Sequence, residues 1–460
     1  MKIQMTMLAT IFREQMKKTK AFGDMSEMTY SVSYGTGFLP LDYATGYVQE
    51  VNGMYKFELG LSDGSINTLI GHSGVGKTSL LIAMACNIIK PFKTSSIFIE
   101  QAEVGTNIQR IKNLSGIRDD NGFANRFIVR DAGITVESIF QRVKAIHDIK
   151  MAHKDQYLYD TGMIDMNGKP IFKFEPTVFI VDSVKLTLSE QNSLKDNTDN
   201  MTGANDARAN SQYYSKMVPL CRSANIIMIL VNHITTKINT DRVPQPSEFP
   251  FLNQNEHLGS AKLLHYISNL MLKLVIVGKY IRGKDNNPFD IDGTLVSIDI
   301  VKSRTNKSGR QRCVLVFNQE VGFDQELSMF MMLKINGVLE GAGAYLRIPG
   351  CDIKFAAKNF KKLLYSNEEF FNAFNACCFN FVRDRLIAEY QEIQKQSNMV
   401  VYEKPSYDAI IANFNGMQPV SALPKNDIAI IDQVSAVAAA DIQLDSDEFD
   451  GDGDSNEEEI

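Results

Sequence analysis

Short apolar runs, each closed by a polar residue or a turn, recur along the first 330 residues of the chain. The runs that predict strands are Ile66–Ile70, Ser95–Glu100, Phe127–Val129, Thr177–Ser183 and Ile226–Val231. Continuous runs of this length are typical of strands buried on both faces of a parallel sheet. Segments with helical periodicity, such as Ser79–Ile89 and Val136–Ile149, alternate with them. This alternation predicts an α/β fold with a mostly parallel central sheet flanked by helices.

Other patterns extend this organisation. Further strands are predicted at Leu270–Gly278, Thr294–Val301 and Cys313–Phe317, the last of which closes the sheet. Helices are predicted at Met1–Phe22, just after the turn at Gly35–Asp42, at Ala209–Arg222, where Pro219 would bend or end the helix, and within Asn367–Lys395. Asn167-Gly168 predicts a peripheral β-hairpin within Met151–Phe174.

These patterns divide the chain into four parts. Residues 1–33 form an N-terminal helix and connector, a candidate oligomerisation element, and residues 34–340 form the α/β core. Residues 341–420 form a small helical C-terminal domain, and residues 421–460 form a linker and a tail that we expect to be disordered.

Composition narrows the function classes. Of the 460 residues, 44% are hydrophobic and 22% are charged, as in soluble globular proteins. No apolar run is long enough to span a membrane, the N-terminus is a poor signal peptide, and the six cysteines show no disulfide or metal-binding spacing. We therefore expect a cytoplasmic protein with reduced thiols and no membrane partner.

Charge is unevenly distributed along the chain. The last twenty residues carry ten of the 54 acidic side chains and no basic one, so the remainder has 48 basic against 44 acidic side chains. A weakly basic body with an acidic tail is compatible with a polyanionic partner for which the tail competes. A tail that only improves solubility is the alternative.

A glycine-rich loop separates the strand run at Ile66–Ile70 from the helical run at Ser79–Ile89. Its sequence is Gly71-His72-Ser73-Gly74-Val75-Gly76-Lys77-Thr78. In this context the pattern GxxxxGK[ST] binds phosphate, because the glycines let backbone N–H groups converge at a helix N-terminus. Lys77 would reach the β- and γ-phosphates, and the Thr78 hydroxyl would hold Mg²⁺. The sequence therefore predicts a nucleotide site formed by Gly71–Ser79; a structural turn is the alternative.

Polar residues follow three of the predicted strands. Glu103 would position the water that attacks the γ-phosphate, with Glu100 as the competing candidate and a helix-capping acid as the alternative. Asp182 would be the second contact to Mg²⁺. His233 would sense the γ-phosphate, unless it only satisfies a backbone carbonyl.

Two long polar segments, Ser189–Arg208 and Thr235–His257, interrupt the α/β pattern. The second contains three prolines, together with Phe249, Phe251, Lys237 and Arg242. Aromatic and basic residues in such loops suit a single-stranded polyanion, which they bind by stacking and phosphate contacts. Five bases also lie within Lys302–Arg312, at the end of a predicted strand, where the first two would contact phosphate.

Taken together, these motifs resemble the RecA-type recombinase family, and most closely the recombinases of T4-type bacteriophages, over residues 34–330. The segments that carry the resemblance are Gly37–Asp42, the glycine-rich loop, Glu103, Val181-Asp182-Ser183, Val231-Asn232-His233, Gly259–Lys262 and Val301–Thr305. The loop sequences themselves do not match the family. Arg110 lies where the family usually stacks an aromatic side chain on adenine.

The resemblance implies a RecA-like P-loop NTPase core and a DNA-dependent ATPase that forms a helical filament on single-stranded DNA. Such a protein binds ATP between subunits and promotes homologous pairing with double-stranded DNA and strand exchange, in recombination and repair. Lys302 and Arg304 would reach the ATP of a neighbouring protomer. The two DNA-binding loops would be Ser189–Arg208, with Arg208 as a DNA contact, and Thr235–His257. Single-strand-binding and loader proteins are the expected partners, in the cytoplasm of a phage-infected bacterium.

Two other functions share these motifs. A hexameric replicative DNA helicase has the same motor core, but we would expect it to have a collar domain before residue 34 and a shorter second loop. A recombination mediator that binds nucleotide but hydrolyses little is the third hypothesis, and its ATPase activity would be weak and unstimulated by DNA.

Overall fold

The computed structural model describes most of the chain. The residues described are 31–51, 53–102, 108–117, 119–164, 168–184, 187–193, 202–236, 247, 249–280, 293–304, 312–319, 321–341 and 345–403. The chain divides into two units, Met1–Glu392 and Ile393–Ile460. The predicted helix at Met1–Phe22, the linker and the acidic tail lie outside the described residues, as do Glu103, Lys237 and Arg242.

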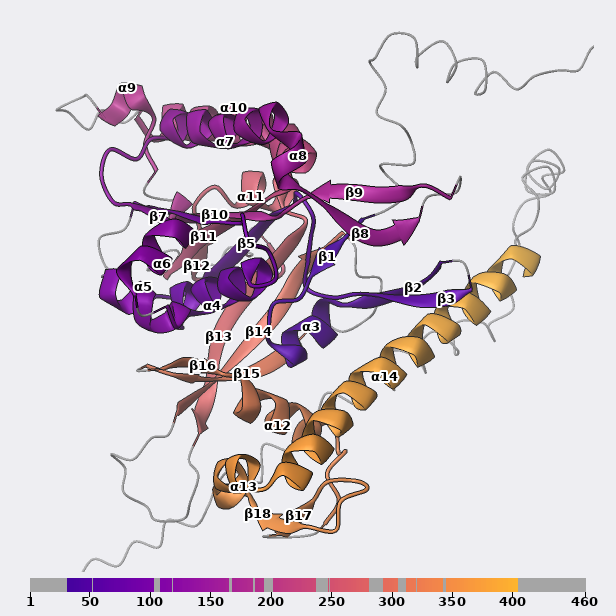
Figure 1. The fold of residues 1–460 in the computed structure, drawn as a ribbon. Helices are drawn as coiled ribbons and strands as arrows, with labels where there is room; N and C mark the ends of the chain where they lie inside the picture. The colour runs from indigo at the N-terminus through magenta and orange to yellow at the C-terminus, as the bar shows by residue number, and fades with distance from the viewer. Residues whose placement is uncertain are drawn as a thin grey trace, which may run out of the picture. The chain divides into compact units, whose positions relative to one another are not determined.

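A large mixed sheet forms the centre of the first unit (Figure 1). Its strands are β5 (Ile66–Gly71), β6 (Ile97–Gln101), β7 (Phe127–Arg130), β10 (Thr177–Asp182), β11 (Ile226–Thr236), β12 (Glu256–Leu258), β13 (Leu270–Tyr280), β14 (Gly293–Ser303), β15 (Arg312–Asn318) and β16 (Gly322–Asp324). They are ordered β16-β15-β14-β13-β5-β11-β10-β6-β7, and β12 pairs with the end of β11. From β13 to β7 all neighbours are parallel, whereas β14, β15 and β16 are added antiparallel.

Helices cover both faces of this sheet. On one face lie α4 (Lys77–Ile89), α5 (Ile108–Ser115) and α6 (Asp120–Arg126); on the other lie α7 (Val136–Ala152), α10 (Thr202–Ala224) and α11 (Ala261–Ile267). The predicted α/β fold with a mostly parallel sheet between helices is therefore confirmed.

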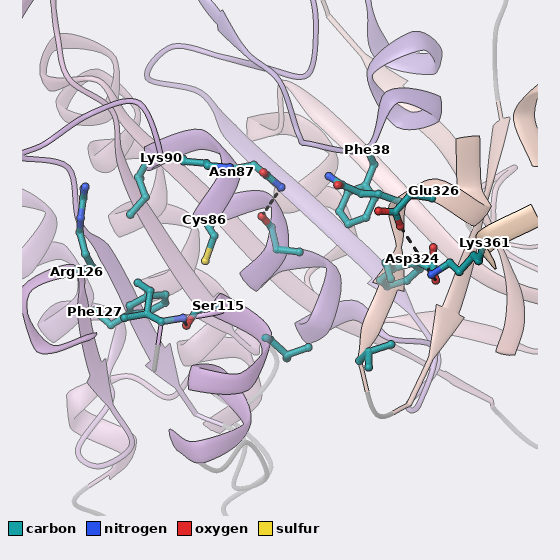
Figure 2. A pocket seen from close by; sticks show the side chains of 17 residues that line it. Phe38, Cys86, Asn87, Lys90, Ser115, Arg126, Phe127, Asp324, Glu326 and Lys361 are labelled. Carbon is teal, nitrogen blue, oxygen red and sulfur yellow. Dashed lines mark hydrogen bonds and ion pairs between the residues drawn. The ribbon is translucent and has the colours of Figure 1, made fainter. Parts of the chain in front are cut away.

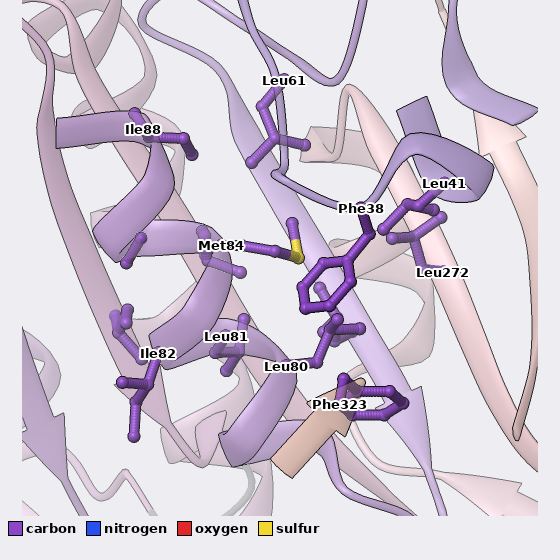
Figure 3. Packing of buried hydrophobic residues seen from close by; sticks show 14 of the residues in the cluster. Phe38, Leu41, Leu61, Leu80, Leu81, Ile82, Met84, Ile88, Leu272 and Phe323 are labelled. Carbon is purple, nitrogen blue, oxygen red and sulfur yellow. The ribbon is translucent and has the colours of Figure 1, made fainter. Parts of the chain in front are cut away.

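Strand alternation creates the two cores. In β10, Val178 and Ile180 pack beneath α4, whereas Phe179 and Val181 pack beneath α7 and α10. Both sets are almost completely buried, which is why this strand is apolar throughout. Figure 3 shows the α4 side, where helix residues such as Leu80 and Met84 meet Phe38 and Phe323 from flanking segments.

The C-terminal part of the first unit forms a third core around α12 (Gln325–Ile335) and α13 (Phe360–Ser366). It includes the first part of α14 (Glu368–Glu403), whose Phe370 and Phe374 are buried, and a small sheet of β17 (Tyr345–Arg347) and β18 (Lys354–Ala356). Val316 of the central sheet belongs to the same cluster, so this helical region is packed directly on the α/β core.

Smaller elements complete the described chain. They are β1 (Ser33–Tyr34), α3 (Leu39–Thr45), β2 (Tyr47–Val51), β3 (Met54–Glu58), β4 (Leu61–Ser62), α8 (Lys154–Tyr157), β8 (Leu158–Ile164), β9 (Pro170–Phe174), α9 (Glu190–Ser193) and the short 3-10 helix Ala357–Asn359. The predicted hairpin is present as β8 and β9, but the residues before it are helical because α7 continues to Ala152 and α8 follows. No helix in the described ranges is both long and apolar enough to cross a membrane.

Four predicted boundaries were wrong. Helix α10 begins at Thr202, inside the segment expected to be a polar loop, and it continues past Pro219 to Ala224. Pro219 lies on the exposed face of the helix, where the carbonyl of the preceding turn that loses its N–H donor is accessible to solvent. Strand β11 continues to Thr236 because β12 pairs with its end, and β16 lies outside β15 at the edge of the sheet.

Candidate functional site

The glycine-rich loop connects β5, at the centre of the sheet, to α4. Gly74 and Gly76 have φ angles of 82° and 89°, in the left-handed region that glycine adopts without strain. A Cβ atom on Gly76 would also lie 3.0 Å from the rings of Phe317 and Phe323. The predicted strand, glycine loop and helix are therefore present in this order.

Lys77 lies over the concave side of this loop. Its ammonium group donates hydrogen bonds to the carbonyl oxygens of Gly71 at 3.0 Å and His72 at 2.7 Å, and it lies 3.3 Å from Nδ1 of His233. The side chain is only 5% exposed although it carries a charge. The fold thus holds a cation where a helix N-terminus and glycine N–H groups are also available, a combination that binds phosphate oxygens.

Thr78 and Asp182 are in direct contact, as the predicted metal site requires. The Thr78 hydroxyl donates to Oδ2 of Asp182 at 2.8 Å. Asp182 lies at the carboxyl end of β10, two strands from β5, and is 7% exposed. A hydroxyl and one carboxylate are oxygen ligands that suit Mg²⁺, which usually takes few protein ligands and completes its shell with phosphate and water. These residues therefore fit a magnesium–nucleotide complex.

Glu100, the competing candidate for the base, faces the other side of the sheet. It is buried beneath α7 and forms an ion pair with Arg142. Burial raises the pKa of Glu100, and the Arg142 guanidinium partly opposes that increase. Its register partner Val181 lies in the core beneath α7 and α10, on the face opposite Asp182. Glu100 is therefore unavailable to the glycine-rich loop, while Glu103 lies outside the described residues.

Gln101 lies next to the candidate site, a position that was not predicted. It is the register partner of Asp182 on the adjacent strand, so the two side chains share a face. It is 7% exposed, and its Nε2 has no hydrogen-bond partner among the described residues. Side chains of a strand point alternately to its two faces, so Gln101 lies on the face opposite Glu100. This alternation was the signal in the sequence that could have identified Gln101.

Arg110 closes one side of the site. Its guanidinium donates to the carbonyl oxygen of Gln319 at 3.0 Å and to the Ser79 hydroxyl at 3.3 Å. A pocket of about 230 Å³ lies here, and Phe317 and Gln319 contribute to its wall. Its other lining residues are Ser73, Gly74, Gly76, Lys77, Thr78, Ser79, Arg110, Asp182 and His233. Of the residues predicted for nucleotide binding, Ser73, Gly74, Gly76–Ser79 and Arg110 line this pocket, whereas Gly71, His72 and Val75 do not. Phe317, in β15, and Gln319, just after it, were not predicted because they come from the antiparallel extension of the sheet.

His233 lies at the last parallel pair between β11 and β5, opposite Gly71. Its backbone N–H donates to Oδ1 of Asn232 at 2.9 Å, and Nδ2 of the fully buried Asn232 donates to the Gly259 carbonyl. Asn232 therefore connects this strand to the start of α11. His233 was expected after the strand, but it lies within β11, at the level of the glycine-rich loop.

The residues predicted for DNA contact are dispersed. Arg208 is exposed near the start of α10. Phe249 and Phe251 stack on each other with ring centroids 5.2 Å apart, and both pack near His265 against a small apolar cluster. Each ring is half-buried, so much of its surface stabilises the fold.

Lys302 and Arg304 do not line the pocket. Lys302 donates to the carbonyl oxygens of His265 and Tyr266, and Arg304 donates to that of Tyr266. Both cations thus lie at the C-terminal end of α11, where the helix dipole favours positive charge. Burial and both cations lower the pKa of His265.

A second cavity, of about 670 Å³, lies beside α4 away from the glycine-rich loop (Figure 2). Phe38, Cys86 and Phe127 contribute apolar surface. Two of its cations are already engaged, since Lys361 pairs with Asp324 and Arg126 donates to the carbonyl oxygens of Phe92 and Ser95. This cavity therefore lacks the donor set found around Lys77.

No family model matches the chain, and a search of curated proteins found none similar to it.

Proposed function

We propose that this protein is an ATP-dependent DNA recombinase of the RecA type, which forms a filament on single-stranded DNA and promotes homologous pairing and strand exchange. The observation that carries the proposal is the single pocket in which Lys77, Thr78, Asp182 and His233 meet at the ends of adjacent parallel strands. Ligands bind at this edge of doubly wound sheets. The connection of that edge to the two predicted DNA loops distinguishes the proposal from a general nucleotide-binding role.

Each described residue has a role that its contacts support. The glycine-rich loop would hold the phosphates, with Lys77 stabilising the charge that develops on the γ-phosphoryl group. Thr78 and Asp182 would hold Mg²⁺, which neutralises phosphate charge when bound. Arg110 and Phe317 would hold the nucleoside side of the pocket.

Other roles depend on residues outside the pocket. Glu103 would orient the attacking water; the proposal is supported by Ala102, the residue after β6, whose backbone N–H donates to the Asp182 carbonyl oxygen at 2.7 Å. Lys302 and Arg304 would act on the nucleotide of a neighbouring protomer, which agrees with their place outside the pocket of their own chain. The two segments 194–201 and 237–246 fall within the predicted DNA loops.

The deciding experiment combines DNA-dependent ATPase and strand-exchange assays with negative-stain imaging on single-stranded DNA and a slowly hydrolysed ATP analogue. We expect ATPase stimulated by single-stranded DNA, exchange of a labelled homologous strand, and open helical filaments. Lys77→Ala serves as the inactive control.

Two outcomes would replace this proposal by another. Closed rings with unwinding activity would indicate a helicase. ATPase that is weak and unaffected by DNA, without strand exchange, would indicate a mediator.

A further inference from the structure

Glu256, the first residue of β12, bridges the glycine-rich loop and the central sheet. Its Oε1 lies 3.1 Å from Nε2 of His72, and its Oε2 accepts hydrogen bonds from Lys273 Nζ and from the Asn253 backbone N–H, each at 2.9 Å. Lys273, on β13, also donates to the Phe251 carbonyl at 2.8 Å. One carboxylate thus joins the loop, the neighbouring strand and the chain that precedes β12.

The bridge is asymmetric in its exposure. The side chains of Glu256 and Lys273 are 9% and 10% exposed, whereas that of His72 is 44% exposed. Burial acts to raise the pKa of Glu256, but the hydrogen bonds from Asn253, Lys273 and His72 outweigh it and lower this pKa to about 2. Glu256 is therefore the buried, anionic member of the bridge, and His72 is its most exposed member.

Glu256 lies at the point where the chain returns to the sheet after residues 237–255. Thr236 and Glu256 form the last pair of the β11–β12 ladder, so residues 237–255 leave and re-enter the sheet there. The outgoing strand contacts the glycine-rich loop through His233, 3.3 Å from Lys77 Nζ. The returning strand contacts it through Glu256 and His72. Both ends of the segment are thus tied to the loop, each by its own side-chain contact.

Binding of a polyphosphate would act on His72, the residue of the glycine-rich loop that contacts Glu256. Lys77 donates to the backbone carbonyl of His72 at 2.7 Å. A phosphate chain would compete for that ammonium group, so we expect this contact of the His72 backbone to differ between the bound and free states. Such a differential contact is what an effector needs in order to shift a conformational equilibrium.

We propose that His72, Glu256 and Lys273 are positioning residues that transmit nucleotide occupancy of the glycine-rich loop to residues 237–255, and so set the affinity for single-stranded DNA. The proposal rests on the proposed function and adds a path that is separate from His233. It uses the returning strand of the segment, whereas His233 uses the outgoing one.

The test measures the affinity for a fluorescent oligo-dT in the presence of ADP and of a slowly hydrolysed ATP analogue. The quantity compared between variants is the affinity with the ATP analogue divided by the affinity with ADP. The bridge is removed by Glu256→Leu together with Lys273→Met, because replacing both charges leaves no buried ion unpaired. The matched control is Asp63→Leu with Lys173→Met, which removes an ion pair of 2.9 Å at the base of the β8–β9 hairpin. His72→Ala breaks the bridge from the loop side, and His72→Gln restores an N–H donor there.

We expect the ratio to fall about 5-fold or more in the bridge variant and in His72→Ala, within the range of allosteric couplings. It should stay unchanged in the control and be largely recovered in His72→Gln. Because coupling is reciprocal, the effect of oligo-dT on the affinity for the ATP analogue, relative to its effect on the affinity for ADP, should fall by the same factor. A purely structural role would weaken DNA binding equally in both nucleotide states.

Two results would overturn the inference. If the parent protein binds DNA in a nucleotide-dependent way and the bridge variant keeps the parental ratio, the inference fails and the proposed function stands. If the parent itself shows no nucleotide-dependent DNA binding, the proposed function fails, and the inference fails with it.

Discussion

Glu100 and Gln101 are adjacent in the chain, yet they belong to opposite faces of the sheet. The carboxylate of Glu100 is paired with Arg142 beneath α7, whereas Gln101 shares its face with Asp182. A single peptide unit thus separates a structural ion pair from the candidate site. At the residue scale, chemistry in this protein depends on which face of a strand a side chain occupies, and the phase of the alternation decides between candidate acids.

The first prediction concerns the two glutamates. Glu103→Gln should lower DNA-stimulated ATPase about 100-fold or more, the effect of losing a general base. Glu100→Gln should leave the turnover number within a few-fold of the parent and instead reduce thermal stability, because Arg142 loses its buried partner. Steady-state ATPase and thermal melts of both variants provide the measurement. A large loss of turnover with Glu100→Gln, and none with Glu103→Gln, would reverse the assignment.

Lys150 gives the second prediction, on pH dependence. It is 4% exposed and donates to the carbonyl oxygens of Glu175 at 2.7 Å and Ala224 at 2.9 Å, and burial lowers its pKa from 10.5 to about 7. Between these two values the unfolded chain binds a proton that the folded chain does not. The contribution of Lys150 to the free energy of unfolding therefore increases from pH 7 to pH 10, by at most about 1.4 kcal/mol per pH unit.

The matching variant is Lys150→Met, which has no titrating group at this position. Urea unfolding at pH 6, 7.5 and 9 should show the stability difference between parent and variant growing with pH. Parallel stability curves would mean that the buried amine stays charged throughout this range.

At the scale of elements, the site depends on how β5, α4 and the β11–β12 ladder meet. In the loop between β5 and α4, Gly76 adopts a positive φ angle, and the rings of Phe317 and Phe323 leave no room for a side chain there. The ladder continues β11 beyond its parallel partners, which brings Glu256 back to the level of His72. The contacts between loop and ladder thus follow from an antiparallel extension of a parallel strand.

Helix α10 supplies a prediction at this scale. Pro219 lies on its exposed face in the helix interior, where proline removes one hydrogen bond and crowds the preceding turn. Pro219→Ala should raise the free energy of unfolding by about 1–2 kcal/mol, since part of the gain is offset by greater freedom of the unfolded chain. The adjacent exposed Val218→Ala is the control, with an expected change within about 0.5 kcal/mol. A destabilised Pro219→Ala would show that the backbone conformation fixed by Pro219 is needed for packing.

At the scale of the whole molecule, the proposed filament divides each ATP site between two protomers. Lys77, Thr78 and Asp182 belong to one half, and Lys302 and Arg304 to the other. Within their own chain, Lys302 and Arg304 hold the end of α11, so they are positioned by contacts that do not involve the pocket. A head-to-tail interface of this kind generates an open helical assembly when its rotation does not close into a ring.

Subunit mixing tests this division. Lys77→Ala and the double variant Lys302→Ala with Arg304→Ala should each be inactive in ATPase assays. In an equal mixture assembled on DNA, about a quarter of the head-to-tail interfaces combine two intact halves. The ATPase activity of the mixture should therefore recover to about a quarter of the parental value. Lys77→Ala mixed with Asp182→Ala is the control and should stay inactive, because both changes affect the same half; recovery there, or none in the first mixture, would contradict the division.

The sequence by itself determined the fold class, most strands of the sheet and the glycine-rich loop. Each of these depends on local signals: continuous apolar runs, helical periodicity and glycines ahead of a lysine and threonine. Local signals are also why Asp182 was found, since it directly follows a buried strand. They failed at the start of α10, because a polar stretch was predicted as a loop although the helix begins at Thr202 and its later residues pack in the same core as α7.

Only the tertiary structure decided which distant side chains meet. It placed Glu100 away from the candidate site and Gln101 beside Asp182, and it brought Phe317 and Gln319 to the pocket from the antiparallel end of the sheet. It also joined His72 to Glu256, which are 184 residues apart in the chain. The physical reason is that such contacts depend on strand order and register, which no short stretch of sequence encodes.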